Sequence, residues 1–152
     1  MIKNHLIRKK MMKKVMNKKN NFQRSWYLCD LNNKVLGRES SKIASILQGK
    51  HLTRYKRGFD CGDNVIVTNA DKFILTGSKK ETKIYYSHSG YIGNLKNMTI
   101  KEKIDASPSD IVKKSVMGML PKNLLRAGMI KRLHICTKNE HPYKNIKIIK
   151  TI

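Results

Sequence analysis

The segment between Gly49 and Gly58 combines side chains that bind phosphate with an aromatic ring. Arginine guanidinium groups bind phosphate oxygens in pairs, and a tyrosine ring can stack on an unpaired base. Glycine at both ends allows the backbone to follow an irregular phosphate path. The alternative is a solvated loop whose charges bind nothing specific. We predict a nucleic-acid-binding loop, and its contacting residues would be Lys50, His51, Arg54, Tyr55, Lys56 and Arg57.

A second candidate is the glycine-rich stretch from His88 to Asn94, which follows a strand-like segment. Because Gly90 and Gly93 have no side chain, a phosphate can approach the backbone closely there. The stretch has neither the G-x-G-x-x-G pattern nor the lysine of a nucleotide-binding loop. An ordinary turn explains it equally well.

Asp60 and Asp63 are the paired carboxylates that could do acid–base or metal chemistry together with His51 or His88. A turn in which each aspartate bonds its own backbone is the simpler interpretation. We predict that the protein is not an enzyme, with no catalytic residues, no cofactor, no metal and no small-molecule substrate.

Four basic residues accompany the mixed apolar segment that runs from residue 118 to residue 133. Its apolar side chains suggest packing between elements, whereas its cations lie where elements end, within reach of backbone phosphates. We predict that these cations contact nucleic acid; they are Lys122, Arg126, Lys131 and Arg132.

The charge of the whole chain supports a polyanionic partner. Its 152 residues include 33 Lys and Arg against 10 Asp and Glu, a formal net charge of +23. Such self-repulsion opposes a compact state, and nucleic acid relieves it while releasing counterions. No apolar run is long enough to span a bilayer, so we expect no membrane partner. Cys29, Cys61 and Cys136 form no C-x-x-C pair, and we interpret them as structural thiols.

The elements that must position these residues alternate between strand and helix. Strand patterns cover residues 26–31, 65–67, 83–86 and 133–136, and a helix from about residue 38 to 48 ends at Gly49. Thr99 and Ser107 each precede an acid by three residues, which predicts two capped helix starts. The second helix has an apolar stripe of Val112, Val116, Met119 and Leu120. Strands separated by helices favour a largely parallel sheet covered by helices.

Residues 1–21 differ in composition from the remainder, with eight Lys and Arg and no acid. We therefore divide the chain into a basic N-terminal extension, 1–21, and an α/β RNA-binding domain, 22–152. The extension is either an organellar targeting peptide or a permanent arm that folds against RNA. We favour the arm, and an import signal that is retained would serve both roles.

A series of short motifs resembles one known family, the universally distributed large-subunit ribosomal protein thirteen in its bacterial and organellar form. The resemblance covers roughly residues 24 to 141, with the motifs in family order. They are Arg24-x-Trp26-Tyr27, Leu36-Gly37-Arg38, Gly49-Lys50-His51 with Tyr55, Asp60-x-Gly62-Asp63, Val65-Ile66-Val67-x-Asn69-Ala70, Thr76-Gly77-x-Lys79, Tyr85-Tyr86-x-His88-x-Gly90-x-Ile92-Gly93, Gly118-Met119-Leu120-Pro121-Lys122 and Asn139-Glu140-His141. The chain departs from the family at Lys56-Arg57, where a proline is usual, and at Asn94, where a glycine is usual.

The resemblance implies a three-layer α/β/α domain with a small, mainly parallel sheet. It also implies a structural constituent of the large ribosomal subunit that binds and organises rRNA and contacts neighbouring ribosomal proteins. A free RNA-binding regulator of translation is the alternative. We expect a ribosome in an organelle, the mitochondrion before the plastid, with the bacterial cytoplasm as the alternative. The predicted RNA-binding residues, the loop and segment cations included, are Arg38, Lys50, His51, Arg54, Tyr55, Lys56, Arg57, Lys79, Lys80, His88, Gly90, Gly93, Lys122, Arg126, Lys131 and Arg132.

Overall fold

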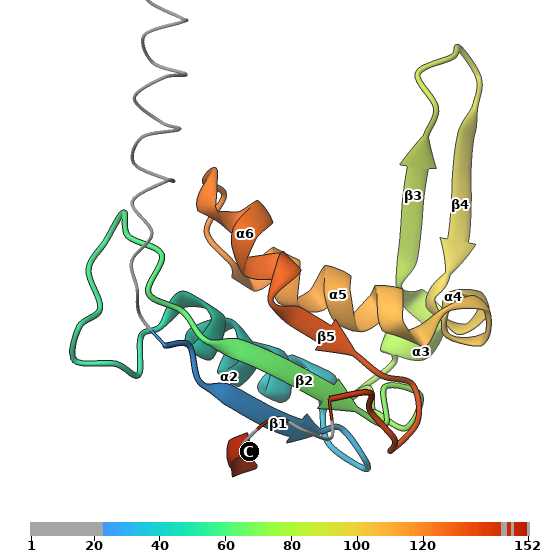
Figure 1. The fold of residues 1–152 in the computed structure, drawn as a ribbon. Coiled ribbons are helices and arrows are strands. Elements are labelled where there is room, and N and C mark those ends of the chain that lie inside the picture. The colour runs from blue at the N-terminus through green and yellow to red at the C-terminus, as the bar shows by residue number, and fades with distance from the viewer. Residues whose placement is uncertain (1–22, 144–145, 147, 152) are drawn as a thin grey trace, which may run out of the picture.

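The computed structural model describes residues 23–143, 146 and 148–151 (Figure 1). The predicted N-terminal extension, 1–21, lies outside the described residues. In chain order the elements are β1 (Trp26–Asp30), α2 (Leu36–Gln48), β2 (Asn64–Thr68), α3 (Lys79–Thr82), β3 (Ile84–His88), β4 (Leu95–Thr99), α4 (Ile100–Ala106), α5 (Pro108–Met119), α6 (Leu125–Lys131), β5 (Leu133–Ile135) and β6 (Ile148–Thr151).

The main sheet has four strands in the order β5-β2-β1-β6, and every pair is parallel. The α/β class with a mainly parallel sheet is therefore confirmed. Strands β3 and β4 do not join this sheet; they pair with each other as an antiparallel hairpin. The strand predicted at residues 83–86 exists as β3, but its neighbour is β4, which the sequence pattern did not indicate.

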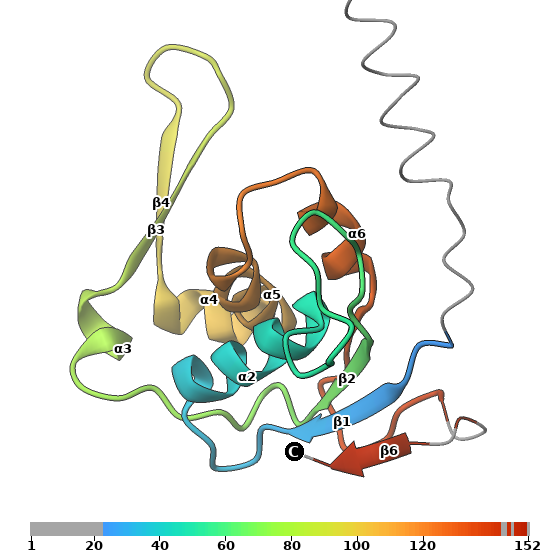
Figure 2. The same cartoon turned by 90° about the vertical axis from the view of Figure 1, so that its left-hand side faces the viewer.

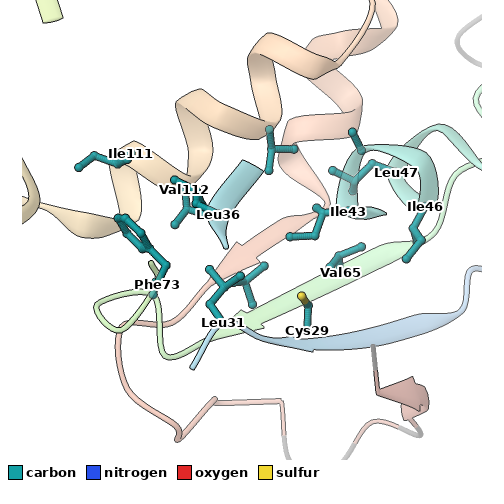
Figure 3. Close-up of a cluster of buried hydrophobic side chains, with 14 of the residues drawn as sticks. Cys29, Leu31, Leu36, Ile43, Ile46, Leu47, Val65, Phe73, Ile111 and Val112 are labelled. Carbon is teal, nitrogen blue, oxygen red and sulfur yellow. The ribbon is translucent and has the colours of Figure 1, made fainter. Parts of the chain in front are cut away.

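One face of the sheet packs against helices and contains the hydrophobic core (Figure 3). Cys29, Val65 and Val67 of the strands, and Leu31 directly after β1, are fully buried on this face. Facing them are apolar residues of α2, α5 and the segments that follow them, namely Ile43, Ile46, Leu47, Ile111, Val112, Val116 and Leu120. The predicted stripe of α5 is correct except at Met119, which is 41% exposed, and Ile111 is a further buried residue of the helix.

The opposite face of the sheet is packed by aromatic rings. Trp26 stacks on His134 with ring centroids 5.4 Å apart, and Tyr143 contacts both rings. The Tyr143 hydroxyl lies 2.8 Å from Nδ1 of His134, and burial lowers the pKa of that imidazole. Helices α2, α4, α5 and α6 all lie on the other side of the sheet (Figure 2). In the part of the chain that the structure describes, the layer on this second face is thus the segment through Tyr143 rather than a helix.

The predicted helix boundaries are largely confirmed. Gly49 ends α2 with a left-handed backbone, φ 79°. At α4 the Thr99 side chain and Glu102 form a reciprocal capping box. Ser107 is the N-cap of α5 as predicted, but its Oγ donates to the Asp110 carboxylate, 3.1 Å away, and makes no capping bond to the backbone. Helix α5 still begins there because proline at its first position is preset for helix.

The β3–β4 hairpin projects from the body of the molecule (Figure 1). Its tip carries large apolar side chains in solvent, including Tyr91 at 78% exposure and Ile92 fully exposed. Among the described residues no helix has the length and apolarity needed to cross a membrane.

Candidate nucleic-acid interface

The predicted loop surrounds a depression of about 450 Å³ next to the start of α6. Lys50, Tyr55, Lys56 and Arg57 line it from the loop. The lining is completed by Gln48, Gly58, Phe59, Pro121, Asn123, Leu125 and Met129. No acidic residue contributes to this lining, while Tyr55 and Phe59 are 38% and 45% exposed. Cations and exposed aromatic rings therefore lie side by side, and a nucleotide could bind with its phosphate at the cations and its base stacked on a ring.

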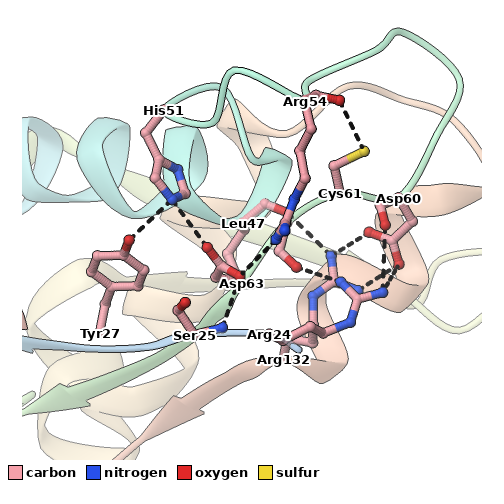
Figure 4. Close-up of polar contacts among 11 residues, drawn as sticks. Arg24, Ser25, Tyr27, Leu47, His51, Arg54, Asp60, Cys61, Asp63 and Arg132 are labelled. Carbon is pink, nitrogen blue, oxygen red and sulfur yellow. Dashed lines mark hydrogen bonds and ion pairs between the residues drawn. The ribbon is translucent and has the colours of Figure 1, made fainter. Parts of the chain in front are cut away.

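Two other residues of the loop, His51 and Arg54, are exposed but contact a buried carboxylate of the protein (Figure 4). Nε2 of His51 lies 3.0 Å from the carboxylate of Asp63, and Arg54 lies 3.9 Å from the same group. Asp63 is fully buried and also accepts the backbone N–H of Ser25 at 2.9 Å. Burial, and then the charge of Asp63, raises the pKa of Tyr27, whose hydroxyl contacts His51 at 3.2 Å.

Asp60 makes the second set of ion pairs. The two terminal nitrogens of the Arg132 guanidinium donate to the Asp60 carboxylate, at 2.6 and 2.7 Å. The guanidinium of Arg24 lies 3.3 Å from the same carboxylate. Arg132 also donates to the carbonyl of Leu47 at 3.1 Å, and Arg24 donates to the carbonyl of Gly62. We call these residues, Arg24, His51, Arg54, Asp60, Asp63 and Arg132, the Asp60–Asp63 network.

The network corrects the interpretation of Asp60 and Asp63 as turn residues that bond their own backbone. Their side-chain partners are 9 to 72 positions distant in the sequence. The carboxylates hold the loop, the start of β1 and the end of α6 together. The side chain of Arg132 is only 11% exposed, so its predicted contact with RNA competes with its ion pair to Asp60. Among the described residues, no group of three His, Cys, Asp or Glu side chains is placed to hold a metal ion.

Gly62 stands between the two carboxylates because the end of α2 passes very close to it. A Cβ on Gly62 would lie 1.8 Å from the carbonyl oxygen of Leu47, a distance no side chain tolerates. The network and this close approach together position the loop against α2.

The glycine-rich stretch forms the tip of the hairpin. Gly90 and Gly93 have positive φ angles of 97° and 77°, and a Cβ added at either would meet no neighbouring atom within 4 Å. Nδ1 of His88 accepts the N–H of Gly90 at 2.9 Å. The stretch is therefore both a turn and an open surface. Figure 1 shows that it lies at the opposite end of the molecule from the loop.

The remaining predicted residues are distributed over several elements. Arg38 is exposed in the first turn of α2, and Lys79 and Lys80 are exposed in α3. Lys122 is exposed before α6, Arg126 is half-buried within it and Lys131 is exposed at its last turn. The structure brings the residues around α6 near the loop, but Arg38, Lys79 and Lys80 belong to other surfaces.

A further basic cluster was not identified from the sequence. The ammonium groups of Lys83, Lys103 and Lys114 lie 5.3, 5.2 and 5.1 Å from the ring centroid of Tyr85. They come from the start of the hairpin, from α4 and from α5. The only sequence signal for this cluster is that α4 and α5 each carry two lysines, and their spacing along the chain does not show that they approach one ring.

The three cysteines are free thiols. Burial, and then the neighbouring carboxylate of Glu39, raises the pKa of Cys29 to about 12. A thiol with such a pKa stays protonated at neutral pH and is a poor nucleophile. The structural role predicted for Cys29 agrees with its place in the core.

The fold and this surface define a class: a strongly basic α/β protein with exposed cationic loops. The model of the family Ribosomal protein L13 matches residues 24–142. The large ribosomal subunit protein uL13 of Geobacter sp. (strain M21) is 46% identical over 142 residues, which cover 90% of this chain and 100% of the relative. The protein of the same description from Thermotoga petrophila is 45% identical over 132 residues, with 87% and 89% covered. The chain belongs to the ribosomal protein L13 family, which confirms the resemblance of its motifs.

Proposed function

We propose that the protein is a structural constituent of the large ribosomal subunit that binds and organises its rRNA and contacts neighbouring subunit proteins. The observation that carries this proposal is the depression beside α6, where Lys50, Lys56 and Arg57 surround exposed rings and no carboxylate is present. Membership of the family and the net charge of +23 support it further. Its relatives are described as proteins of the large subunit.

In this proposal the protein holds separate RNA segments at its two ends. The loop residues bind backbone phosphates, and Tyr55 stacks on an unpaired base. The hairpin tip, with Gly90 and Gly93, contacts a second segment. The Asp60–Asp63 network keeps the loop in one conformation, so that little ordering entropy is lost on binding. We propose no enzymatic activity for this protein.

The proposal is tested with the double variant Lys56→Gln and Arg57→Gln, binding to the organism's own large-subunit rRNA transcribed in vitro. Each phosphate contact contributes about 0.7 to 0.9 to the slope of log affinity against log salt. We expect the slope to decrease by about 1.5 when the two contacts are lost. The matched control is Lys72→Gln with Lys138→Gln, which removes equal charge from exposed positions outside the predicted set.

A wild-type protein that does not bind this RNA would overturn the proposed function. Equal slopes in the two double variants would show that Lys56 and Arg57 do not touch phosphate.

The ribosome that we propose is organellar, with the mitochondrion before the plastid. The support is the composition of residues 1–21, which are basic and free of acid, and which lie outside the part matched by the family model. The relatives named above are bacterial, so a bacterial ribosome is the alternative. Cell fractionation together with mass spectrometry of the mature N-terminus distinguishes these locations.

A further inference from the structure

The cluster around Tyr85 places more positive charge at one ring than the ring can stabilise. A ring has two faces, so at least two of the three ammonium groups of Lys83, Lys103 and Lys114 share one face. Lys103 and Lys114 lie over the ring at 5.2 and 5.1 Å, and of the three lysines these two also line one crevice. Contact with the Lys103 amine, followed by burial, lowers the pKa of Lys114, and the carboxylate of Asp110 offsets this only in part. One cation–π contact stabilises by about 0.5 to 1 kcal/mol at exposed sites, which does not explain why two ammonium groups are held together.

The pair faces a crevice of about 440 Å³ between the hairpin and helices α4 and α5. The residues that line it are Tyr85, Tyr86, Ser87, Leu95, Lys96, Asn97, Met98, Lys103 and Lys114. None of them is acidic. In the antiparallel register Tyr85 pairs with Met98 and Ser87 pairs with Lys96. Because side chains alternate along a strand, these four lie on one face of the hairpin, and Lys96 adds a third cation to the crevice.

We propose that this crevice is a separate RNA-binding site, in which Lys103 and Lys114 together bind one phosphate of the RNA backbone. The inference rests on the proposed function, and it adds a site that the predicted residues did not include. A phosphate between the two ammonium groups replaces their repulsion with two charge-assisted hydrogen bonds. Tyr85 forms the apolar floor of the site, and Lys96 contacts the adjacent phosphate.

The chemistry of the crevice favours a nucleic acid over an acidic protein segment. Phosphate groups along a strand repeat at short intervals, which suits cations on both walls of an open crevice. The hydroxyls of Tyr85 and Ser87, which lie on this face of the hairpin, supply hydrogen-bond partners for ribose and phosphate oxygens.

The test compares two double variants that remove the same charge from the same two helices. Lys103→Gln with Lys114→Gln removes the proposed ligands, whereas Lys101→Gln with Lys113→Gln removes exposed lysines directed elsewhere on α4 and α5. Binding to the transcribed large-subunit rRNA is measured between low and moderate salt. We expect the first variant to bind about tenfold more weakly and to lose about 1 from the salt slope, while the second changes both by much less.

Lysine acetylation followed by mass spectrometry gives a second readout on the wild-type protein. Addition of the RNA should protect Lys103 and Lys114 more than Lys101 and Lys113. Lys103→Arg with Lys114→Arg should restore binding, because arginine retains the charge and the hydrogen bonds to phosphate. Thermal unfolding of each variant shows whether the fold is retained.

The outcomes separate the inference from the proposed function. If the wild-type protein binds the RNA but the two Gln variants weaken equally, the crevice is not a phosphate site. The same conclusion follows if the Lys103–Lys114 variant lowers the unfolding temperature without changing affinity, since the lysines would then only hold the hairpin against the helices. Absence of wild-type binding would instead overturn the proposed function.

Discussion

The Asp60–Asp63 network and the crevice below the β3–β4 hairpin differ in how their positive charges are balanced. In the network, buried or half-buried carboxylates bind His51, Arg24 and Arg132 within the protein. In the crevice, cations crowd around Tyr85, and no acidic residue lines the space. In the first region each cation has a carboxylate partner, whereas no carboxylate lines the second.

This difference teaches that a net charge of +23 is not a uniform surface property. Some arginines hold the loop in place through ion pairs within the protein, and other cations of the loop remain exposed for binding. Arg132 has the residue type and position of a phosphate ligand, yet it makes a two-point ion pair with Asp60. Substitutions in the network should therefore mainly lower the free energy of unfolding, and substitutions in the crevice should mainly lower the affinity for RNA.

The largest effect on stability is expected from Gly62→Ala. Its Cβ would meet a backbone carbonyl of α2, which cannot move away as a side chain can. We expect the free energy of unfolding to fall by about 3 kcal/mol or more, measured by urea denaturation. Gly90→Ala in the hairpin has open space and only the strain of its positive φ, which costs about 1 kcal/mol. A smaller loss for Gly62 than for Gly90 would contradict the comparison.

An intermediate effect is expected from Asp63→Ala. The substitution leaves the Ser25 N–H without its partner and removes the carboxylate from His51 and Arg54. We expect a loss of about 2 kcal/mol in the free energy of unfolding, since the part-buried Ser25 N–H loses its acceptor and the ion pair to His51 is removed. The control Lys96→Ala, exposed on the hairpin, should change stability by less than about 0.5 kcal/mol. Equal stabilities would mean that the network does not support the loop.

The smallest effect concerns the ionisation of Lys114. Its pKa lies below the ordinary value of 10.5 chiefly because of Lys103. The unfolded chain therefore binds more protons in the pH range just below 10.5, and folding stability rises with pH there. Lys103→Gln should return the pKa of Lys114 towards the ordinary value and slow its acetylation at pH 8 to 9, with Lys113 as the internal reference. Unchanged acetylation of Lys114 would show that the two amines do not interact in solution.

Local signals predicted the elements whose boundaries depend on near neighbours. The stripe of Ile43, Ile46 and Leu47 with Gly49 defines α2, and Thr99 with Glu102 defines the start of α4. Strand β4 escaped prediction because its residues are largely exposed and show no apolar alternation. Helix α6 and strand β6 were also missed. Each is short, and helix and strand propensities are weak when summed over so few residues.

The sequence by itself determined that this protein is basic, α/β and a member of its family, because charge, periodicity and ordered motifs are properties of the linear chain. It also indicated the loop from Gly49 to Gly58 as a binding element. Only the tertiary structure decided which cations are free to act. Asp60 meets Arg132 across 72 positions, and Lys103 and Lys114 meet over a ring from a separate hairpin. Electrostatic pairing depends on distance in space, and the packing of α2, α4, α5 and the hairpin sets that distance.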